Sequence, residues 1–331
     1  MATIHFERPA YVKAYAVCAG KKEGAGPLGD RFDVVCPDGW YGEKSWEKAE
    51  MKMVSTAWRT ALQKGGVSPA ELGCALGGDL LNQCVSTSFG MRESGIPFLG
   101  LYGACSTMAE SLLIGSSFIS GGVQDYVLCT ASSHFCSAER QYRYPLAYGG
   151  QRPPTAQWTA SAAAAVVLTK ETQKVKITRA HIGKIYDPGV TDANNMGAAM
   201  AQSAYETISS YFSDTGDKPE DYDIIVTGDL ASIGKQLVLD LFDGDGVNMR
   251  PVYDDCGLML FHGGQDVHAG ASGCGCSAAV LGGYLLPALE KGIFKKILFC
   301  GTGALLSPIT STQGESIPGI CHLICLESEV K

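Results

Sequence analysis

Ile96-Pro-Phe-Leu-Gly-Leu-Tyr-Gly-Ala-Cys105-Ser-Thr-Met108 is the stretch of sequence that decides the fold. An apolar run leads into a turn of small residues, and a cysteine follows that turn. Ser106 and Thr107 come next, and both residue types are favoured where a helix begins. Residues 94–124 contain a single charge, so this helix must be covered on all sides. The stretch predicts a strand, a tight turn, a cysteine and a buried helix, in that order.

Cys105 at the start of a helix has two chemical interpretations. Unpaired backbone N–H groups and the helix dipole both favour a thiolate, which would make the residue a nucleophile or the floor of an anion pocket. Free cysteines are also among the most buried residue types, so an inert core cysteine is the alternative. The residue taken alone leaves both interpretations open.

The composition excludes several classes of protein. The 331 residues are 46% hydrophobic and 18% charged, with a net charge of −8 and no long basic run, which argues against a nucleic-acid-binding surface. The thirteen cysteines are an odd number, and several lie inside apolar runs, so we expect reduced thiols in a cytosolic compartment. Cys274 and Cys276 form the only tight pair, with no second pair at zinc-finger spacing, so no metal site is expected.

Two other segments bear on targeting. The N-terminus has no basic region followed by an apolar one, so no signal peptide is expected. Residues 269–289 carry no charge, but they are rich in Gly, Ser and Cys and include Pro287. We expect a loop and a core helix there and no transmembrane segment in the chain.

An internal duplication is the main organising feature of the chain. Pro69 and Pro219 are 150 residues apart, as are Asp79 and Asp229, and Cys105 and Cys276 are 171 apart. Blocks repeated in one order indicate two related halves, residues 1–172 with Cys105 and residues 173–331 with Cys274 and Cys276. Alternating helices and strands imply parallel strands with right-handed crossovers. Two nearly uncharged helices, one from each half, would form a central layer. We predict an α/β fold, a five-layered αβαβα sandwich.

The duplicated sandwich with a cysteine at the tip of a buried helix resembles the thiolase and ketoacyl synthase superfamily. Within it, several motifs spread over nearly the whole chain resemble the stage V sporulation protein AD family. These motifs are Gly26-Pro-Leu-Gly29, Gly78-Asp79-Leu-Leu-Asn-Gln83, Gly103-Ala-Cys105-Ser-Thr107, Ala138-Glu139-Arg-Gln-Tyr-Arg-Tyr-Pro145, Asp255-Cys-Gly-Leu-Met259, Gly273-Cys-Gly-Cys-Ser-Ala278 and Thr302-Gly-Ala-Leu-Leu-Ser-Pro308.

This resemblance implies a function in sporulation and spore germination. The family binds dipicolinic acid (pyridine-2,6-dicarboxylate) for uptake into the developing spore. The resemblance implies work with integral-membrane partners of the same operon, the SpoVA proteins, and a peripheral location on the cytoplasmic side of the forespore or spore inner membrane. It also implies a thiolase-like homodimer.

The resemblance also implies which catalytic groups a condensing enzyme would need. A neighbouring His, with a second His or Asn, must activate the cysteine and stabilise an oxyanion. Asp229 lies near the first expected position, and the turn Gly273-Cys-Gly-Cys276 lies at the second. A carboxylate near Cys105 would raise its pKa, which disfavours a nucleophile. We predict a non-catalytic thiolase homologue. The alternative is an acyl-thioester condensing enzyme that uses Cys105, a ketoacyl-ACP synthase III- or thiolase-like acyltransferase. In that case His134 or His268 would supply the missing base.

A dipicolinate site needs different groups, because the ligand is flat, aromatic and doubly anionic. We expect Cys105, Cys274 and Cys276 to form the pocket floor and two helix N-termini to supply N–H groups. The remaining candidate residues are a set of hydroxyls (Ser106, Thr107, Ser277), arginines of the long loop (Arg140, Arg143, Arg152), the ring of His134 and the carboxylates Asp79, Asp229 and Asp255. The carboxylates repel a dianion unless calcium or a proton accompanies it, or else they cap helices. No cofactor is expected other than calcium carried with dipicolinate.

Overall fold

The computed structural model describes residues 2–142 and 151–330, and its strands fall into two sets of five. The first half contributes β1 (Thr3–Ala19), β3 (Cys74–Gly78), β4 (Phe98–Gly100), β5 (Tyr126–Ser133) and β7 (Ala162–Thr169). The second half contributes β8 (Val175–His181), β9 (Ile224–Thr227), β10 (Tyr253–Asp255), β12 (Lys296–Ala304) and β13 (Gly319–Ser328). The strand orders are β4-β3-β5-β7-β1 and β10-β9-β12-β13-β8, so each half repeats the other.

The direction of the strands repeats as well. In each half the first three strands of that order are mutually parallel, and the last two pair antiparallel. The halves are joined where β1 pairs antiparallel with β8, for example Thr3 with His181. The loop between β7 and β8 contains the boundary between residues 172 and 173, and the division into separate domains stays a prediction. Beside the main sheet, β2 (Val34–Val35) pairs with β1, and β6 (Trp158–Thr159) pairs with β11 (Ala271–Ser272).

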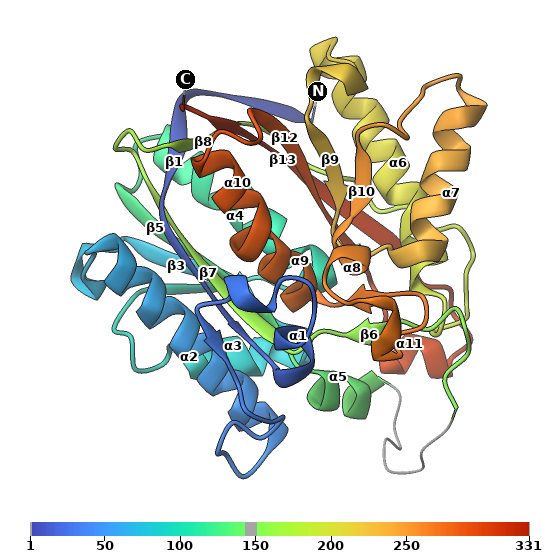
Figure 1. The fold of residues 1–331 in the computed structure, drawn as a ribbon, viewed down its shortest axis with the longest axis horizontal. Helices are drawn as coiled ribbons and strands as arrows, with labels where there is room; N and C mark the ends of the chain where they lie inside the picture. The colour runs from blue at the N-terminus through green and yellow to red at the C-terminus, as the bar shows by residue number, and fades with distance from the viewer. Residues whose placement is uncertain (1, 143–150, 331) are drawn as a thin grey trace.

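The helices form three layers around the two sets of strands (Figure 1). One outer layer holds α2 (Trp46–Gly65) and α3 (Val85–Met91), and the other holds α6 (Met196–Thr215) and α7 (Ala231–Gly244). Between the halves lie α4 (Thr107–Ser120) and a second helix made of α9 (Cys274–Val280), a π-helical turn (Leu281–Leu285) and α10 (Leu286–Glu290). The predicted five-layered sandwich is therefore confirmed.

Shorter helices cover the ends of the sheet. They are α1 (Lys21–Gly24), α5 (Phe135–Tyr142), α8 (Cys256–Met259), α11 (Pro308–Thr312) and the 3-10 helices Gly29–Arg31, Pro69–Glu71, Asn82–Cys84, Ala104–Ser106, Pro219–Asp221 and Gly263–Gln265. Within residues 2–142 and 151–330, no helix has the length and apolar character that crossing a membrane requires.

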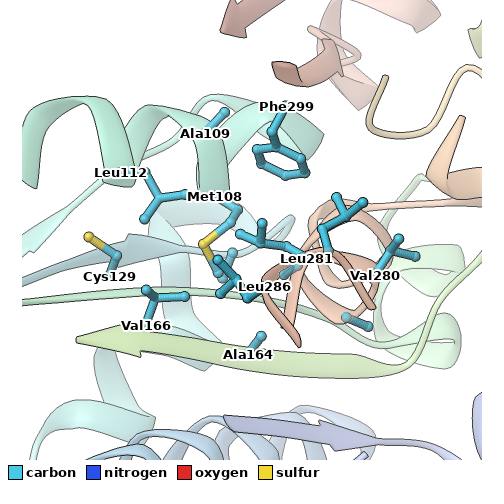
Figure 2. Packing of buried hydrophobic residues seen from close by; sticks show 14 of the residues in the cluster. Met108, Ala109, Leu112, Cys129, Ala164, Val166, Val280, Leu281, Leu286 and Phe299 are labelled. Carbon is cyan, nitrogen blue, oxygen red and sulfur yellow. The ribbon is translucent and has the colours of Figure 1, made fainter. Parts of the chain in front are cut away.

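The alternation of side chains along each strand builds the layers. In β7, Ala164 and Val166 face the central helices, whereas Ala165 and Val167 face α2. In β12, Phe299 points to the central layer, and its neighbours Leu298 and Cys300 pack under α6 and α7. Figure 2 shows the central cluster, in which Met108 and Leu112 of α4 meet Leu281 and Leu286 of the opposite helix. Because the two central helices are largely buried among apolar side chains, a nearly uncharged sequence suits them.

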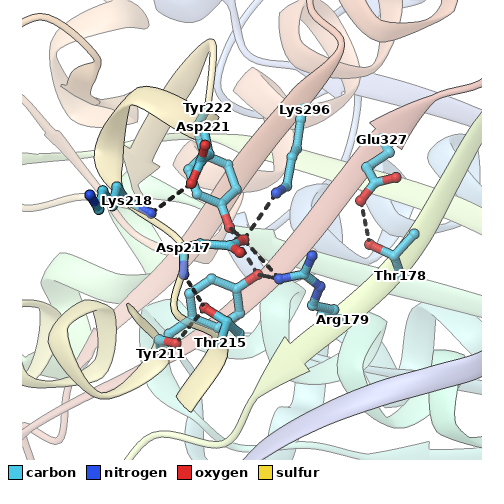
Figure 3. Close-up of polar contacts among 10 residues, drawn as sticks. All are labelled: Thr178, Arg179, Tyr211, Thr215, Asp217, Lys218, Asp221, Tyr222, Lys296 and Glu327. Carbon is cyan, nitrogen blue, oxygen red and sulfur yellow. Dashed lines mark hydrogen bonds and ion pairs between the residues drawn. The ribbon is translucent and has the colours of Figure 1, made fainter. Parts of the chain in front are cut away.

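A polar cluster lies in the second half of the chain, at the end of β12 where Lys296 begins the strand (Figure 3). The Asp217 carboxylate accepts hydrogen bonds from Arg179 Nη1 (2.7 Å), Lys296 Nζ (3.0 Å) and the Tyr222 hydroxyl. Burial alone would raise the pKa of Asp217, but these bonds and the nearby cations hold it below its usual value. The cluster ties the segment after α6 to β8 and β12 and is structural.

Candidate functional site

Cys105 lies in a strained turn, as the sequence predicts. β4 ends at Gly100, a 3-10 turn covers Ala104–Ser106, and α4 follows directly. Ala104 has φ +51°, which is unfavourable for a residue with a Cβ, so the surrounding structure holds the turn in place. Cys105 itself is 6% exposed. The predicted order of strand, turn, cysteine and buried helix is confirmed.

A pocket opens above Cys105 and draws its walls from both halves. Its empty volume is about 410 Å³, part of which is open to solvent. The lining residues are Leu80, Ala104, Cys105, Ala138, Glu139, Tyr142, Thr159, Met196, Ser272, Ala304 and Leu306. A further hollow, which includes Asn82 and Ser307, adjoins it through Tyr142 and Leu306 and marks the entrance. The site is thus an apolar pocket with few polar groups, which is typical of small-molecule sites.

Asp229 is the carboxylate that the sequence places near Cys105, and the structure brings the two together. Asp229 is fully buried and accepts hydrogen bonds from the Gly273 N–H (2.8 Å) and the Thr302 hydroxyl (2.8 Å). Burial raises the pKa of the Cys105 thiol well above its ordinary value, and the Asp229 charge raises it further. Burial also raises the pKa of Asp229. The helix start therefore does not produce a thiolate here.

The second expected position of a catalytic partner holds two buried thiols. The Cys274 thiol donates to the Ser132 carbonyl (2.8 Å), and the Cys276 thiol donates to the Gly228 carbonyl (3.6 Å). Neither residue lines the pocket above Cys105. The structure therefore does not bring these two thiols to the pocket floor with Cys105.

The candidate hydroxyls are used by their own helices. Ser106 donates to the Gly103 carbonyl (2.7 Å), Thr107 to the Ala104 carbonyl (2.7 Å), and Ser277 to the Cys274 carbonyl (3.4 Å). None of these three side chains lines the pocket. Their contact with a ligand stays a prediction that the described geometry does not support.

Asp79 and Asp255 cap helices, the structural role that the sequence left open. Asp79 accepts hydrogen bonds from Leu81 N and from both N–H and hydroxyl of Thr87, at 2.7–2.8 Å. Asp255 is the N-cap of α8 and accepts from Gly257 N (2.9 Å). Burial raises the pKa of both carboxyls, that of Asp255 to about 7. Neither carboxyl lines the pocket.

The two histidines lie away from Cys105. His134 is 2% exposed, contacts the Gly39 carbonyl through Nε2 (2.9 Å) and lines a different pocket. Burial lowers its pKa. His268 contacts the Pro153 carbonyl through Nδ1 (2.7 Å) and the Asp266 carboxylate through Nε2 (3.1 Å). The pocket lining described above therefore contains no histidine to act as the base for Cys105.

The arginines are also engaged elsewhere. Arg140, on α5, forms an ion pair with Glu47 on α2. Arg152 donates to the Asp266 carbonyl (2.8 Å) and stacks near the Trp158 ring, 4.8 Å from its centroid. Arg143 lies outside the described residues. Neither described arginine lines the pocket above Cys105.

Most of the pocket lining was not among the predicted site residues. Glu139 and Tyr142 come from one face of α5, and Met196 and Leu306 come from the second half. Glu139 is 5% exposed and is within hydrogen-bond distance of the Thr159 hydroxyl (3.4 Å). In the sequence, Glu139 belongs to the motif Ala138–Pro145, which could have drawn attention to it. The motif alone does not say which of its side chains faces a ligand. Over the described ranges, no group of three or more His, Cys, Asp or Glu side chains is arranged to hold a metal.

Comparison with known proteins places this geometry in context. Residues 1–327 match the profile of the family described as stage V sporulation protein AD. Stage V sporulation protein AD of Bacillus subtilis (strain 168) is 41% identical over 322 residues, which cover 97% of this chain and 95% of the relative.

Solved structures of thiolase-like enzymes share the fold. The 3-oxoacyl-[acyl-carrier-protein] synthase III of Aquifex aeolicus superposes with a TM-score of 0.58 at 16% identity, covering 96% of this chain and 99% of that chain. OleA of Xanthomonas campestris with acetamide bound superposes with a TM-score of 0.62 at 15% identity, covering 98% and 100%. At this identity the likeness concerns the fold alone.

Proposed function

The chain belongs to the stage V sporulation protein AD family, and from this premise we propose that it binds dipicolinic acid without catalysing a condensation. The ligand would occupy the pocket above Cys105 for uptake into the developing spore. The protein would work as a homodimer at the inner spore membrane, beside integral-membrane partners of its operon. The sporulation role rests on family membership. The proposal that the protein binds a ligand and does not catalyse a reaction rests on the groups around the pocket.

The observation that carries the non-catalytic proposal is the pair Cys105 and Asp229. A condensing cysteine needs a base that removes its proton and a donor that stabilises an oxyanion. Here a carboxylate faces the thiol and raises its pKa, and the lining residues include no histidine. The nearest groups therefore hold the thiol protonated, which suits a pocket wall and not a nucleophile.

The pocket suits a small, flat molecule. Its empty space of about 410 Å³ includes part of the open mouth, so the enclosed part has room only for a small ligand. Leu80, Met196 and Leu306 supply apolar walls for a ring. The Ser272 hydroxyl is buried and has no hydrogen-bond partner among the described residues, so it can donate to a ligand carboxylate.

Charge determines the form in which dipicolinate would bind there. The lining that the structure describes contains one acidic side chain, Glu139, and no lysine or arginine, so the lining itself supplies no cation for a dianion. A free dianion would be repelled, whereas a calcium chelate or a protonated acid would not. We therefore expect the calcium chelate to be the preferred ligand of this pocket.

Isothermal titration with calcium dipicolinate tests the proposal. Wild type should bind saturably, and Leu306→Trp, which fills the entrance, should weaken binding tenfold or more. Glu139→Gln should reduce the preference for the chelate over the free acid, because the repulsion is removed. Glu93→Gln, at an exposed glutamate after α3, is the matched control and should change nothing. Absence of saturable heat with wild type would contradict the binding proposal and favour a purely structural adaptor whose pocket no longer binds a ligand. Unchanged binding in Leu306→Trp would place the site elsewhere.

The alternative of a condensing enzyme has a separate test. Labelled acyl-CoA is incubated with the protein, and the mass of the Cys105 peptide is measured. We expect no stoichiometric acylation, because the thiol is held protonated. Acylation followed by turnover would contradict the non-catalytic proposal.

A further inference from the structure

A second and larger pocket lies on the other side of α5. Its empty volume is about 960 Å³, and it shares no lining residue with the pocket above Cys105. Its lining comes from the segment after β1, from helix α2 and from the first residues of α5, among other segments. Phe135 and Cys136 face it, whereas Ala138, Glu139 and Tyr142 of the same helix face the first pocket. The two pockets are therefore separate sites divided by one helix.

Cations surround an aromatic pair at this second pocket. Trp158 stacks on Phe135 with a centroid distance of 3.8 Å and an interplanar angle of 9°. Lys22 Nζ lies 3.4 Å from the centroid of the Trp158 ring, and the Arg152 guanidinium lies 4.8 Å from it. Lys21 also lines the pocket. Burial and the Arg152 charge lower the pKa of Lys22, which means that an added anion would relieve a repulsion already present.

The acids of this pocket do not cancel that charge. The Glu23 carboxylate is fully buried and accepts the Ser161 N–H (2.9 Å), and burial raises its pKa to about 7. Asp38 accepts the N–H groups of Trp40 and Tyr41 (2.8 and 2.9 Å). Glu23 is therefore partly neutral near pH 7, and the two lysines of the lining outnumber its one remaining acid, Asp38.

His134 supplies a buried polar atom that lacks a partner. The Gly39 carbonyl can only accept, so Nε2 of His134 carries the proton and donates to it. Nδ1 is buried and has no hydrogen-bond partner within the described part of the chain. In the neutral ring Nδ1 can only accept a hydrogen bond, and burial lowers the pKa of the ring. A bound anion beside the ring would favour its protonation. Protonation of the ring would let Nδ1 donate to a carboxylate.

We propose that this second pocket binds a small aromatic carboxylate as its free anion, independently of the pocket above Cys105. Lys21 and Lys22 would pair with the carboxylate, and Met53 and Phe135 would contact the ring. His134 would donate to the carboxylate from Nδ1 only after its ring takes up a proton on binding. The linings differ in their cations. The lysines of the second pocket favour a metal-free anion, whereas the described lining of the pocket above Cys105 contains no lysine or arginine. The ligand class rests on the proposed function, but the second site does not depend on where calcium dipicolinate binds.

Titration with metal-free dipicolinate, in the presence of a calcium chelator, tests this inference. Wild type should bind one equivalent saturably. Lys22→Met should weaken binding tenfold or more, Lys22→Arg should retain it, and His134→Phe should weaken it several-fold. Lys48→Met, an exposed lysine on α2 outside this pocket, is the matched control and should bind as wild type. Thermal melting of each variant confirms that it is folded.

The variant Leu306→Trp separates this inference from the proposed function. It should leave metal-free binding unchanged, because Leu306 lines only the pocket above Cys105 and its entrance. Lack of saturable binding in wild type, equal binding in Lys22→Met, or loss of binding in Leu306→Trp would each overturn the second site. Loss of calcium dipicolinate binding in Leu306→Trp together with retained metal-free binding would support both proposals.

Discussion

Cys105 experiences two opposed influences. Its place at the start of α4 favours the thiolate, whereas burial and the Asp229 carboxylate favour the thiol. Burial and the Asp229 charge are the largest influences on the thiol, and both raise its pKa, so they exceed the effect of the helix start. The result is a cysteine that keeps the position of a nucleophile and has lost its reactivity.

Alkylation kinetics test this balance at Cys105. At pH 8 we expect iodoacetamide to label the Cys105 peptide more slowly than the half-buried Cys136. Asp229→Asn should accelerate labelling of Cys105 at least threefold, because the carboxylate that raises the thiol pKa is gone. Asp255→Asn is the control, since Asp255 caps α8 and is not among the groups that raise the pKa of Cys105. Equal rates in wild type and Asp229→Asn would show that Asp229 has no influence on the thiol.

At the scale of elements, the duplicated halves use equivalent positions differently. Asp79 and Asp229 each follow the first parallel strand of their half. Asp79 turns to the backbone ahead of α3 and caps it, whereas Asp229 turns to Gly273 and Thr302 and faces Cys105. The repeat therefore preserves the strand order but not the role of the aspartate.

Helix α2 contributes a buried acid beneath the site. Glu50 accepts hydrogen bonds from Ser132 of β5 and Ser137 of α5, both at 2.9 Å, with no cation in contact. Burial, with the nearby Asp79 charge, raises the pKa of Glu50 from 4.5 to about 8. The carboxyl thus binds its proton more tightly in the folded chain than in the unfolded one.

This shift predicts how stability depends on pH. Because the folded-state pKa is the higher one, the contribution of Glu50 is fully present below about pH 4.5, falls as pH rises, and is lost above about pH 8. Glu50→Gln removes this dependence and should stabilise the protein at pH 9 by on the order of 1–3 kcal/mol relative to wild type, with little difference at pH 4.5. Thermal melting at pH 4.5, 6 and 9 measures it, with the exposed Glu220→Gln as control. A variant that is no more stable than wild type at pH 9 would contradict the assignment.

At the scale of the whole molecule, the sheet ends at an exposed strand. β4 is the last strand of its path, and Leu99 on it is 49% exposed. Phe89 on the neighbouring α3 is 48% exposed. An exposed edge strand with apolar side chains is suited to pairing with another chain. This edge is where we expect a second copy to bind.

Light scattering after size exclusion tests the dimer. Wild type should have twice the mass of one chain, and Leu99→Lys should shift it toward the monomer, because a lysine at the centre of the paired edge is unfavourable. Ile293→Lys, at an exposed apolar residue in the turn after α10, is the matched control and should remain dimeric. A wild-type monomer, or a dimeric Leu99→Lys, would exclude this interface.

The sequence by itself determined the architecture and the place of the pocket. Constant spacings between repeated blocks indicated two halves, and two nearly uncharged helices indicated a central layer, because a helix without a polar face must be buried. The turn before Cys105 located one wall of the pocket. These features depend on local patterns along the chain, which is why they could be predicted.

Only the tertiary structure decided which side chains meet. Glu139, Met196 and Leu306 come together from distant segments, whereas Arg140 pairs with Glu47 and His134 lines a separate pocket. The direction of each side chain depends on packing between elements, and a hydrogen bond can be satisfied by whichever partner lies nearest after folding. Sequence spacing carries little of that information, so the fold was predictable and most of the pocket lining was not.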